Sequence, residues 1–138
     1  MKRKIARGLR NNNPGNIRNS DAQDWKGEVS PAAKKDGAFE EFSEIKFGYR
    51  ALIKLLQTYR KKYNCQTIQD FINKWAPPIE NDTKSYIAAV CREMDVNPDF
   101  IPDINDKDTM CRMAAAISLV ENGVPANMED VEQGWNLL

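Results

Sequence analysis

The stretch that decides the fold is residues 45–63, which read IKFGYRALIKLLQTYRKKY. Its apolar and aromatic side chains recur at alternating steps of four and three residues, at Ile45, Tyr49, Leu52, Leu56, Tyr59 and Tyr63. This spacing puts them on one face of a helix with 3.6 residues per turn. The stretch therefore predicts a long amphipathic helix with one buried face, and Ser43 is its expected N-cap.

Shorter helices are expected after this one. Capping and stop signals place them after Thr67, from Asp82 or Thr83, from about Thr109 to Asn122, and after Asn127. Pro77-Pro78 should end the first of them, and Gly123 is a typical residue to follow the third. The acidic segment 95–106 contains two prolines and is expected to be a loop.

The segment before the long helix has a different character. Residues 13–42 offer short strand candidates at Ile17, 25–29 and 38–42, separated by turn residues. The motif RNNNPGNIR, residues 10–18, predicts a type II turn with a positive φ at Gly15. We therefore expect one α+β, mainly helical domain over residues 1–138, with about five helices and a small irregular β element near the N-terminus. Residues 1–9 are expected to form a basic arm.

Composition excludes several classes of function. Twenty lysines and arginines balance twenty aspartates and glutamates, so nucleic acid is not an expected partner. Binding of nucleic acid is the alternative that the basic N-terminal segment alone supports. The chain has no histidine, which excludes Ser-His-Asp and Cys-His nucleophile activation and removes the commonest catalytic zinc ligand. No metal or cofactor is expected, and carboxylates become the leading acid-base candidates.

Targeting signals and cysteines point to the place of synthesis. The three cysteines are widely spaced and predict buried thiols in a protein made in a reducing compartment. The sequence shows neither a secretory apolar region after its basic start nor a run long enough to span a bilayer. We expect synthesis in the cytoplasm without a signal peptide and no membrane insertion.

Glu121 is the carboxylate with the most unusual position. It shares one helix face with Met110, Ala114 and Ile117, so it continues an apolar stripe. It also lies at the helix C-terminus, where the helix dipole disfavours negative charge. Partial burial and this dipole both favour the neutral carboxyl that a general acid requires. A solvated glutamate at a frayed helix end is the alternative on periodicity alone.

Tryptophan side chains are candidates for sugar stacking. Trp75 and Trp135 fall on apolar helical stripes and are expected in the core. Trp25 lies between Asp24 and Lys26 in the irregular segment, so it is the better candidate for ligand contact, with a place in the core as its alternative.

Several motifs together resemble proteins of phages and prophages. They are GLRNNNPGNIR at residues 8–18, Trp25-x-Gly27, Phe39-x-x-Phe42, Gly48-x-Arg50-Ala51, and the segment from Trp75 to Ile87. The proteins that they resemble are described as virion structural proteins or lysozyme-like peptidoglycan hydrolases. The resemblance covers nearly the whole chain and implies a lysozyme-like domain.

A second, more distant resemblance concerns lytic transglycosylases and bacterial glucosaminidases. Residues 82–90 look like the segment that brings a tyrosine, here Tyr86, to the cleft of those enzymes. Residues 114–123 look like their catalytic helix, with Glu121 as the acid, although Asn122 replaces the usual serine. In those families this helix precedes the asparagine-rich turn, and here it follows. The order implies a circularly permuted lysozyme-like domain.

These resemblances imply cleavage of peptidoglycan glycan strands between N-acetylmuramic acid and N-acetylglucosamine. Glu121 would be the catalytic acid and base, with substrate-binding residues Asn13, Asn16, Arg18, Trp25 and Tyr86. A hydrolase needs a second carboxylate, for which Asp24 and Glu41 are candidates, with Asp21 and Glu28 in the same region. A transglycosylase needs Glu121 alone and is slightly favoured.

The alternative function is a non-catalytic virion or wall-binding protein. Peptidoglycan is the expected partner in both cases, with phage virion proteins as further partners, and the protein would act at the cell wall after release or as part of a virion.

Overall fold

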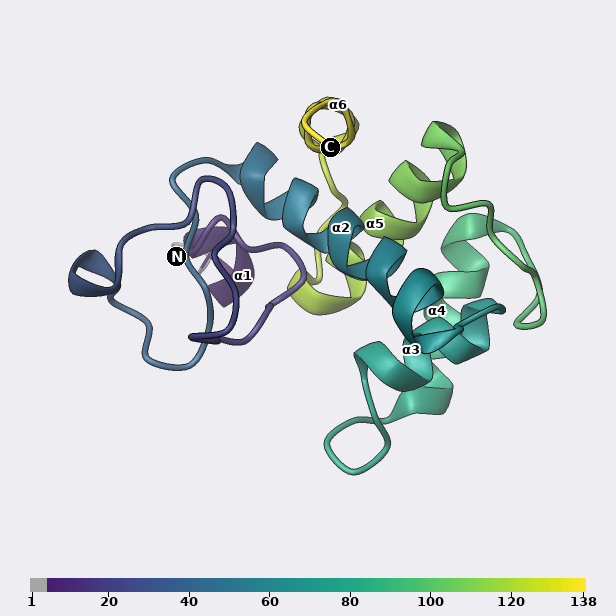
Figure 1. Cartoon of the computed structure of the whole chain (residues 1–138). Helices are drawn as coiled ribbons and strands as arrows, with labels where there is room; N and C mark the ends of the chain where they lie inside the picture. The colour runs from purple at the N-terminus through teal and green to yellow at the C-terminus, as the bar shows by residue number, and fades with distance from the viewer. Residues whose placement is uncertain (1–4) are drawn as a thin grey trace.

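The computed structural model describes residues 5–138, which form a helical domain with an irregular N-terminal segment (Figure 1). The elements in chain order are α1 (Arg7–Arg10), the 3-10 helix η1 (Pro31–Ala33), α2 (Ile45–Tyr63), α3 (Ile68–Trp75), α4 (Thr83–Met94), α5 (Lys107–Asn122) and α6 (Met128–Asn136). The long helix that the sequence predicts is α2, and its expected stripe is buried at Tyr49, Leu52 and Leu56.

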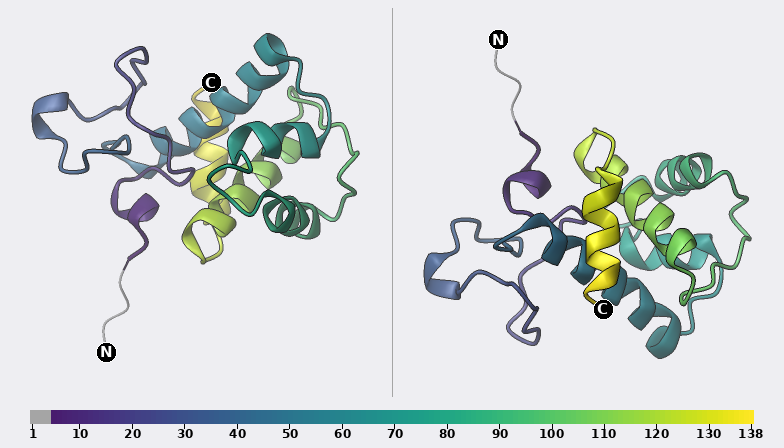
Figure 2. Two further views of the ribbon diagram at one scale, coloured as in Figure 1. Left: turned by 90° about the horizontal axis from the view of Figure 1, so that it is seen from below. Right: turned by 90° about the horizontal axis from the view of Figure 1, so that it is seen from above.

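Helix α2 is the element on which the rest of the domain packs. Helices α3, α5 and α6 all contact it, and α6 crosses it closely (Figure 2). The close crossing depends on Gly134, because a Cβ there would lie 2.7 Å from the Cβ of Tyr49. The core between the helices contains fully buried side chains from α2, α3 and α5, among them Ile53, Phe71 and Ile117.

The helix ends follow the capping signals of the sequence with two corrections. Thr67 caps α3 through a reciprocal capping box with Asp70, and the side chains of Asp82 and Asn127 cap α4 and α6. The expected Ser43 cap of α2 is wrong, because Glu44 occupies that position and makes no side-chain cap hydrogen bond. Helix α5 begins at Lys107, before the expected Thr109, because Asp106 accepts the Thr109 N–H and caps it.

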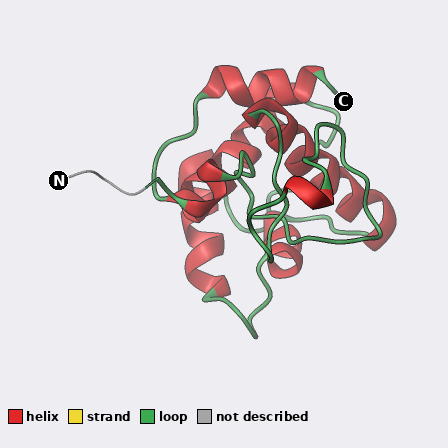
Figure 3. Cartoon of the chain, turned by 90° about the vertical axis from the view of Figure 1, so that its left-hand side faces the viewer, coloured by secondary structure: helices red, strands yellow, loops and turns green. Residues whose placement is uncertain are grey.

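The expected α+β class is wrong, because residues 5–138 contain six α-helices and no sheet (Figure 3). The strand candidates of residues 13–42 meet only in two isolated bridges, Arg18 with Phe39 and Glu28 with Phe42. The prediction of a lysozyme-like domain with a β element is therefore also wrong. The physical reason is that side chains accept or donate many of the hydrogen bonds that a ladder would use, as for Ala38 and Phe39, whose N–H groups both donate to Asp36.

The asparagine-rich turn is also built differently from the expectation. The Asn16 N–H donates to the Asn13 carbonyl at 3.0 Å, so a turn forms with Pro14 and Gly15 at its centre. It is not type II, because Gly15 lacks a positive φ; Asn12 and Asn16 have positive φ instead, at 53° and 50°. Gly15 is required for space, since a Cβ there would lie 2.7 Å from the Trp75 ring.

Two further expectations concern the chain start and the cysteines. Residues 1–4 of the expected basic arm lie outside the described residues, and residues 7–9 belong to α1. The prediction of buried thiols is confirmed, because Cys65, Cys91 and Cys111 are buried and form no disulfide. No helix in residues 5–138 combines the length and apolar character that a membrane span requires.

Candidate functional site

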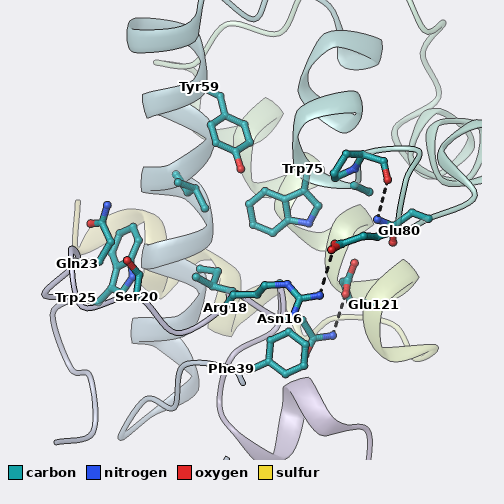
Figure 4. A pocket seen from close by; sticks show the side chains of 16 residues that line it. Asn16, Arg18, Ser20, Gln23, Trp25, Phe39, Tyr59, Trp75, Glu80 and Glu121 are labelled. Atoms are coloured by element: carbon teal, nitrogen blue, oxygen red, sulfur yellow. Dashed lines mark hydrogen bonds and ion pairs between the residues drawn. The ribbon is translucent and has the colours of Figure 1, made fainter. Parts of the chain in front are cut away.

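A groove runs between the irregular N-terminal segment and the helices, and it encloses about 550 Å³ (Figure 4). One side comes from the asparagine turn and the residues that follow it, and the other from α2, the end of α3 and the loop before α4. Its lining residues are Gly15, Asn16, Ile17, Arg18, Ser20, Gln23, Trp25, Phe39, Leu55, Tyr59, Trp75, Ala76, Pro77, Glu80, Asn81 and Glu121. The groove therefore joins segments that are far apart in the sequence.

Glu121 borders this groove from the last turn of α5. Its Oε1 accepts a hydrogen bond from Asn16 Nδ2 at 2.8 Å, and its Oε2 accepts one from the Tyr86 hydroxyl at 2.7 Å. Both carboxylate oxygens are thus held by neutral donors, and the side chain is only partly exposed. The alternative of a solvated glutamate at a frayed helix end does not describe this arrangement.

The residue after Glu121 fixes the asparagine turn against α5. Asn122 is buried, and its Nδ2 donates to the carbonyls of Pro14 and Ser118 at 2.9 Å each. This amide therefore joins the end of the helix to the turn that carries Asn16. Asn122 stands where the enzymes that the sequence resembles have a serine, and here its side chain bonds the turn through the Pro14 carbonyl.

Asn13 does not line the groove, in contrast to its expected role in substrate binding. It is fully buried, its Nδ2 donates to the carbonyls of Ile17 and Glu40, and its Oδ1 accepts the Ile17 N–H. All three bonds measure 2.9–3.0 Å. With its amide fully engaged, Asn13 organises the segment, and its neighbours Asn16 and Arg18 line the groove.

Tyr86 lies behind Glu121 and does not line the groove. It is buried in α4, and its burial together with the neighbouring Glu121 charge raises the pKa of its hydroxyl well above the usual range. The hydroxyl therefore keeps its proton and serves as a donor to Glu121. The sequence correctly placed Tyr86 near the proposed acid, but its role is to hold the carboxylate.

Aromatic rings form much of the groove wall. Trp25 lines it, and its buried indole Nε1–H has no hydrogen-bond partner among residues 5–138. Trp75 is half-buried: it packs against the core, where the sequence placed it, and it also lines the groove. Tyr59 and Phe39 add two more rings that the sequence analysis missed, and burial raises the pKa of Tyr59 to about 12. Such flat apolar faces suit sugar rings.

The candidates for a second carboxylate lie away from this wall. Asp24 is exposed and does not line the groove. Glu41 accepts the backbone N–H groups of Lys35 and Asp36, at 2.6 and 2.9 Å, so it has a structural role. The carboxylate that lines the groove beside Glu121 is Glu80, which the sequence analysis did not select. Its local sequence carries no signal that sets it apart from an ordinary exposed glutamate.

The groove carries opposite charges on its two sides. Arg18 and Glu80 face each other across the groove, with Arg18 Nη2 and Glu80 Oε2 3.6 Å apart (Figure 4). Within the described part of the chain, no three Cys, Asp or Glu side chains gather in a way that could hold a metal ion. The groove thus offers two carboxylates, one guanidinium, amide groups and aromatic faces. This set can bind a hydroxyl-rich chain and exchange protons with it.

The fold and the groove define a small helical protein with a carboxylate-bearing cleft, and sequence comparison gives its family. The chain is 34% identical over 132 residues to Protein P5 of Pseudoalteromonas phage PM2. The aligned region covers 94% of this chain and 80% of that protein. The chain belongs to the family of this phage protein. No protein-family model matches the chain.

This membership confirms the phage association that the sequence predicts. The name of the relative specifies no activity, so the relation to peptidoglycan hydrolases stays a prediction.

Proposed function

We propose that this protein binds peptidoglycan glycan strands in the groove and cleaves the bond between N-acetylmuramic acid and N-acetylglucosamine. Glu121 acts as the general acid and base. The protein would act at the cell wall, after release from the host cell or as part of a virion together with other phage proteins. Membership in a phage protein family supports this setting.

The observation that carries the proposal is the environment of Glu121. Asn16 comes from the N-terminal turn, Tyr86 from α4 and Glu121 from α5, and their side chains meet at the border of one groove. Two donors hold the carboxylate in a fixed orientation, which a proton-transfer group needs. The aromatic wall beside it suits stacking on pyranose rings.

The chemistry follows from this placement. Glu121 in its protonated form gives its proton to the glycosidic oxygen while the bond to the anomeric carbon breaks. Tyr86 and Asn16 orient the carboxyl before and after the transfer. A water molecule or a hydroxyl of the sugar itself then completes the reaction at the anomeric carbon, as in a hydrolase or a lytic transglycosylase respectively.

The second candidate is a non-catalytic virion or wall-binding protein, and one feature favours it. Both oxygens of Glu121 are already occupied by bonds within the chain, so the residue also ties α5 to the N-terminal turn and to α4. A tie of this kind needs no turnover. In this candidate the groove binds glycan strands and releases them unchanged.

The variant Glu121→Gln separates the two candidates. A glutamine cannot act as an acid, but it keeps the size of the side chain and its Oε1 still accepts from Asn16. The Tyr86 hydroxyl can rotate to accept from the new amide, so we expect the fold to be kept. Glu93→Gln, at an exposed position on α4, is the matched control.

Both variants and the wild type are assayed for release of soluble fragments from purified peptidoglycan. We expect release by the wild type and Glu93→Gln and loss by Glu121→Gln. Equal release by all three would remove Glu121 from the mechanism. Binding of peptidoglycan without release by the wild type would favour the non-catalytic candidate.

A further inference from the structure

We infer that Glu80 is the second carboxylate of this site and that it activates a water molecule, so that glycan strands are hydrolysed. This inference rests on the proposed function and assigns its missing nucleophile. It replaces the slight preference for a transglycosylase, which came from a sequence in which no second carboxylate stood out.

The composition of the groove selects Glu80. Among its lining residues only Glu80 and Glu121 carry carboxyl groups. The other candidates are engaged or displaced: Glu28 pairs with Lys34 at 3.3 Å, Glu41 accepts two backbone N–H groups, and Asp24 lies outside the groove. A water molecule placed against a sugar in this groove can therefore meet one carboxylate besides Glu121.

The local structure presents Glu80 to the groove. The Glu80 N–H donates to the Pro77 carbonyl at 3.1 Å, and the Asn81 side chain donates to the same carbonyl at 3.2 Å. These bonds make residues 77–81 a compact turn at the end of α3. Figure 4 shows Glu80 and Glu121 at the same end of the groove, with the Arg18 guanidinium reaching toward Glu80.

The two carboxylates have different surroundings, and this difference divides their roles. Glu121 is partly buried and held by two neutral donors. The Glu80 side chain is 57% exposed, and its ionic partner among residues 5–138 is Arg18, whose side chain is 65% exposed. Exposed ion pairs of this kind contribute little to stability, so substrate can separate Glu80 from Arg18 without disturbing the fold. The accessible carboxylate is the one that water can reach.

The reaction balances with one water molecule as the co-reactant. Glu121 gives its proton to the glycosidic oxygen, and the bond between that oxygen and the anomeric carbon breaks. The water oxygen forms the new bond to the anomeric carbon while Glu80 accepts a proton from the water. The products are a free reducing end and a free hydroxyl, and a later exchange of protons with solvent restores Glu80 and Glu121.

The test is digestion of peptidoglycan in water enriched in the heavy oxygen isotope, with mass spectrometry of the soluble products. The wild type should give reducing ends that carry the heavy oxygen and no anhydro-sugar ends. Glu80→Gln should lower the rate by about a hundredfold or more, because general bases typically contribute that much. Asp24→Asn, an exposed position outside the groove, and Glu93→Gln should retain the wild-type rate.

A pH profile distinguishes a base from a group that only shapes the groove. The Glu80→Gln variant should lose the acidic limb of the rate profile, which a merely structural role would leave in place. Anhydro-sugar ends from the wild type, or an unchanged rate and profile in Glu80→Gln, would overturn this inference while Glu121→Gln still reports on the proposed function. Absence of any cleavage by the wild type would overturn both.

Discussion

The two halves of this molecule are held together by different forces. Residues 45–138 are helices that bury apolar side chains against one another, such as Leu52 of α2 and Met113 of α5. Residues 5–44 contain little regular structure, and polar side chains organise their backbone. Asn13 and Asp36 together make hydrogen bonds to the backbone of Ile17, Glu40, Ala38 and Phe39.

The comparison shows how the site forms. The irregular half contributes Asn16 and Arg18, while the helical half contributes Tyr86, Glu80 and Glu121. Because the groove lies where the two halves meet, its geometry depends on the polar bonds of one half and on the packing of the other. Substitutions can therefore test the two contributions separately.

The largest effect is expected in the helical half. Ile53→Ala removes a fully buried side chain from α2 and leaves a cavity, which should lower the free energy of unfolding by about 2–5 kcal/mol. Denaturant titration measures this loss, with the exposed Lys61→Ala as the control on the same helix. A loss no larger than that of Lys61→Ala would show that the helical half does not depend on this core.

A smaller and more local effect is expected from Asn13→Ala. The change leaves the Ile17 N–H and the Glu40 carbonyl buried without their partner, at a cost of about 1–3 kcal/mol. Hydrogen exchange should increase in residues 11–42 while the amides of α2 and α5 keep their protection. Uniform loss of protection over both halves would show that they are not stabilised separately.

Asp36→Asn should make a still smaller, pH-dependent difference. The hydrogen bonds from the Arg7 guanidinium, then those from the Ala38 N–H and the Asn11 side chain, hold the pKa of Asp36 well below its usual range. A carboxyl with a lowered pKa stabilises the fold above its unfolded pKa of about 4, and this stability is lost as the pH falls toward the native pKa.

The wild type should therefore be more stable than Asp36→Asn at pH 7, and the gap should shrink progressively below about pH 4. The amide oxygen that the substitution introduces can still accept from the N–H groups of Ala38 and Phe39, so the turn is kept, while the new NH2 group cannot accept from Arg7 and Asn11 as Oδ2 does. Denaturant titrations at several pH values give the gap. A constant gap between pH 7 and pH 3 would mean that the Arg7 pair contributes no charge-dependent stability.

The smallest effect is expected from Asp95→Gly at the end of α4. Asp95 has a φ of 56°, in the left-handed region that favours glycine, and its negative charge lies at the unfavourable end of the helix dipole. The substitution should raise the free energy of unfolding by about 0.5 kcal/mol, reduced by the freedom that glycine adds to the unfolded chain. Denaturant titration beside the wild type measures the change. A destabilised variant would show that Asp95 makes a contact that the local rules miss.

The sequence predicted the helical half well because that half follows local rules. Periodicity located α2, and side-chain caps located the starts of α3, α4 and α6. It failed for the irregular half, where the pattern of short apolar runs predicts strands. There the backbone bonds to Asn13, Asp36 and Glu41, partners whose choice depends on tertiary contacts.

The candidate site divides in the same way. Glu121 and Tyr86 lie at helical positions and contact each other, and Asn16, Arg18 and Trp25 line the groove; their part in binding stays a prediction. Asn13 and Glu41 proved to be structural, because an amide or carboxylate in a turn-rich segment can serve the backbone as easily as a ligand. Glu80 was missed because nothing in its local sequence distinguishes it from an ordinary exposed glutamate.

In the proposed mechanism Glu121 transfers a proton to a glycan strand in this groove. The most direct test is mass spectrometry of the soluble products that the wild type and Glu121→Gln release from purified peptidoglycan, with binding to the same material measured alongside. We expect glycan fragments from the wild type, and from Glu121→Gln no fragments but undiminished binding. Equal fragment release by the two proteins, or binding without release by the wild type, would contradict it.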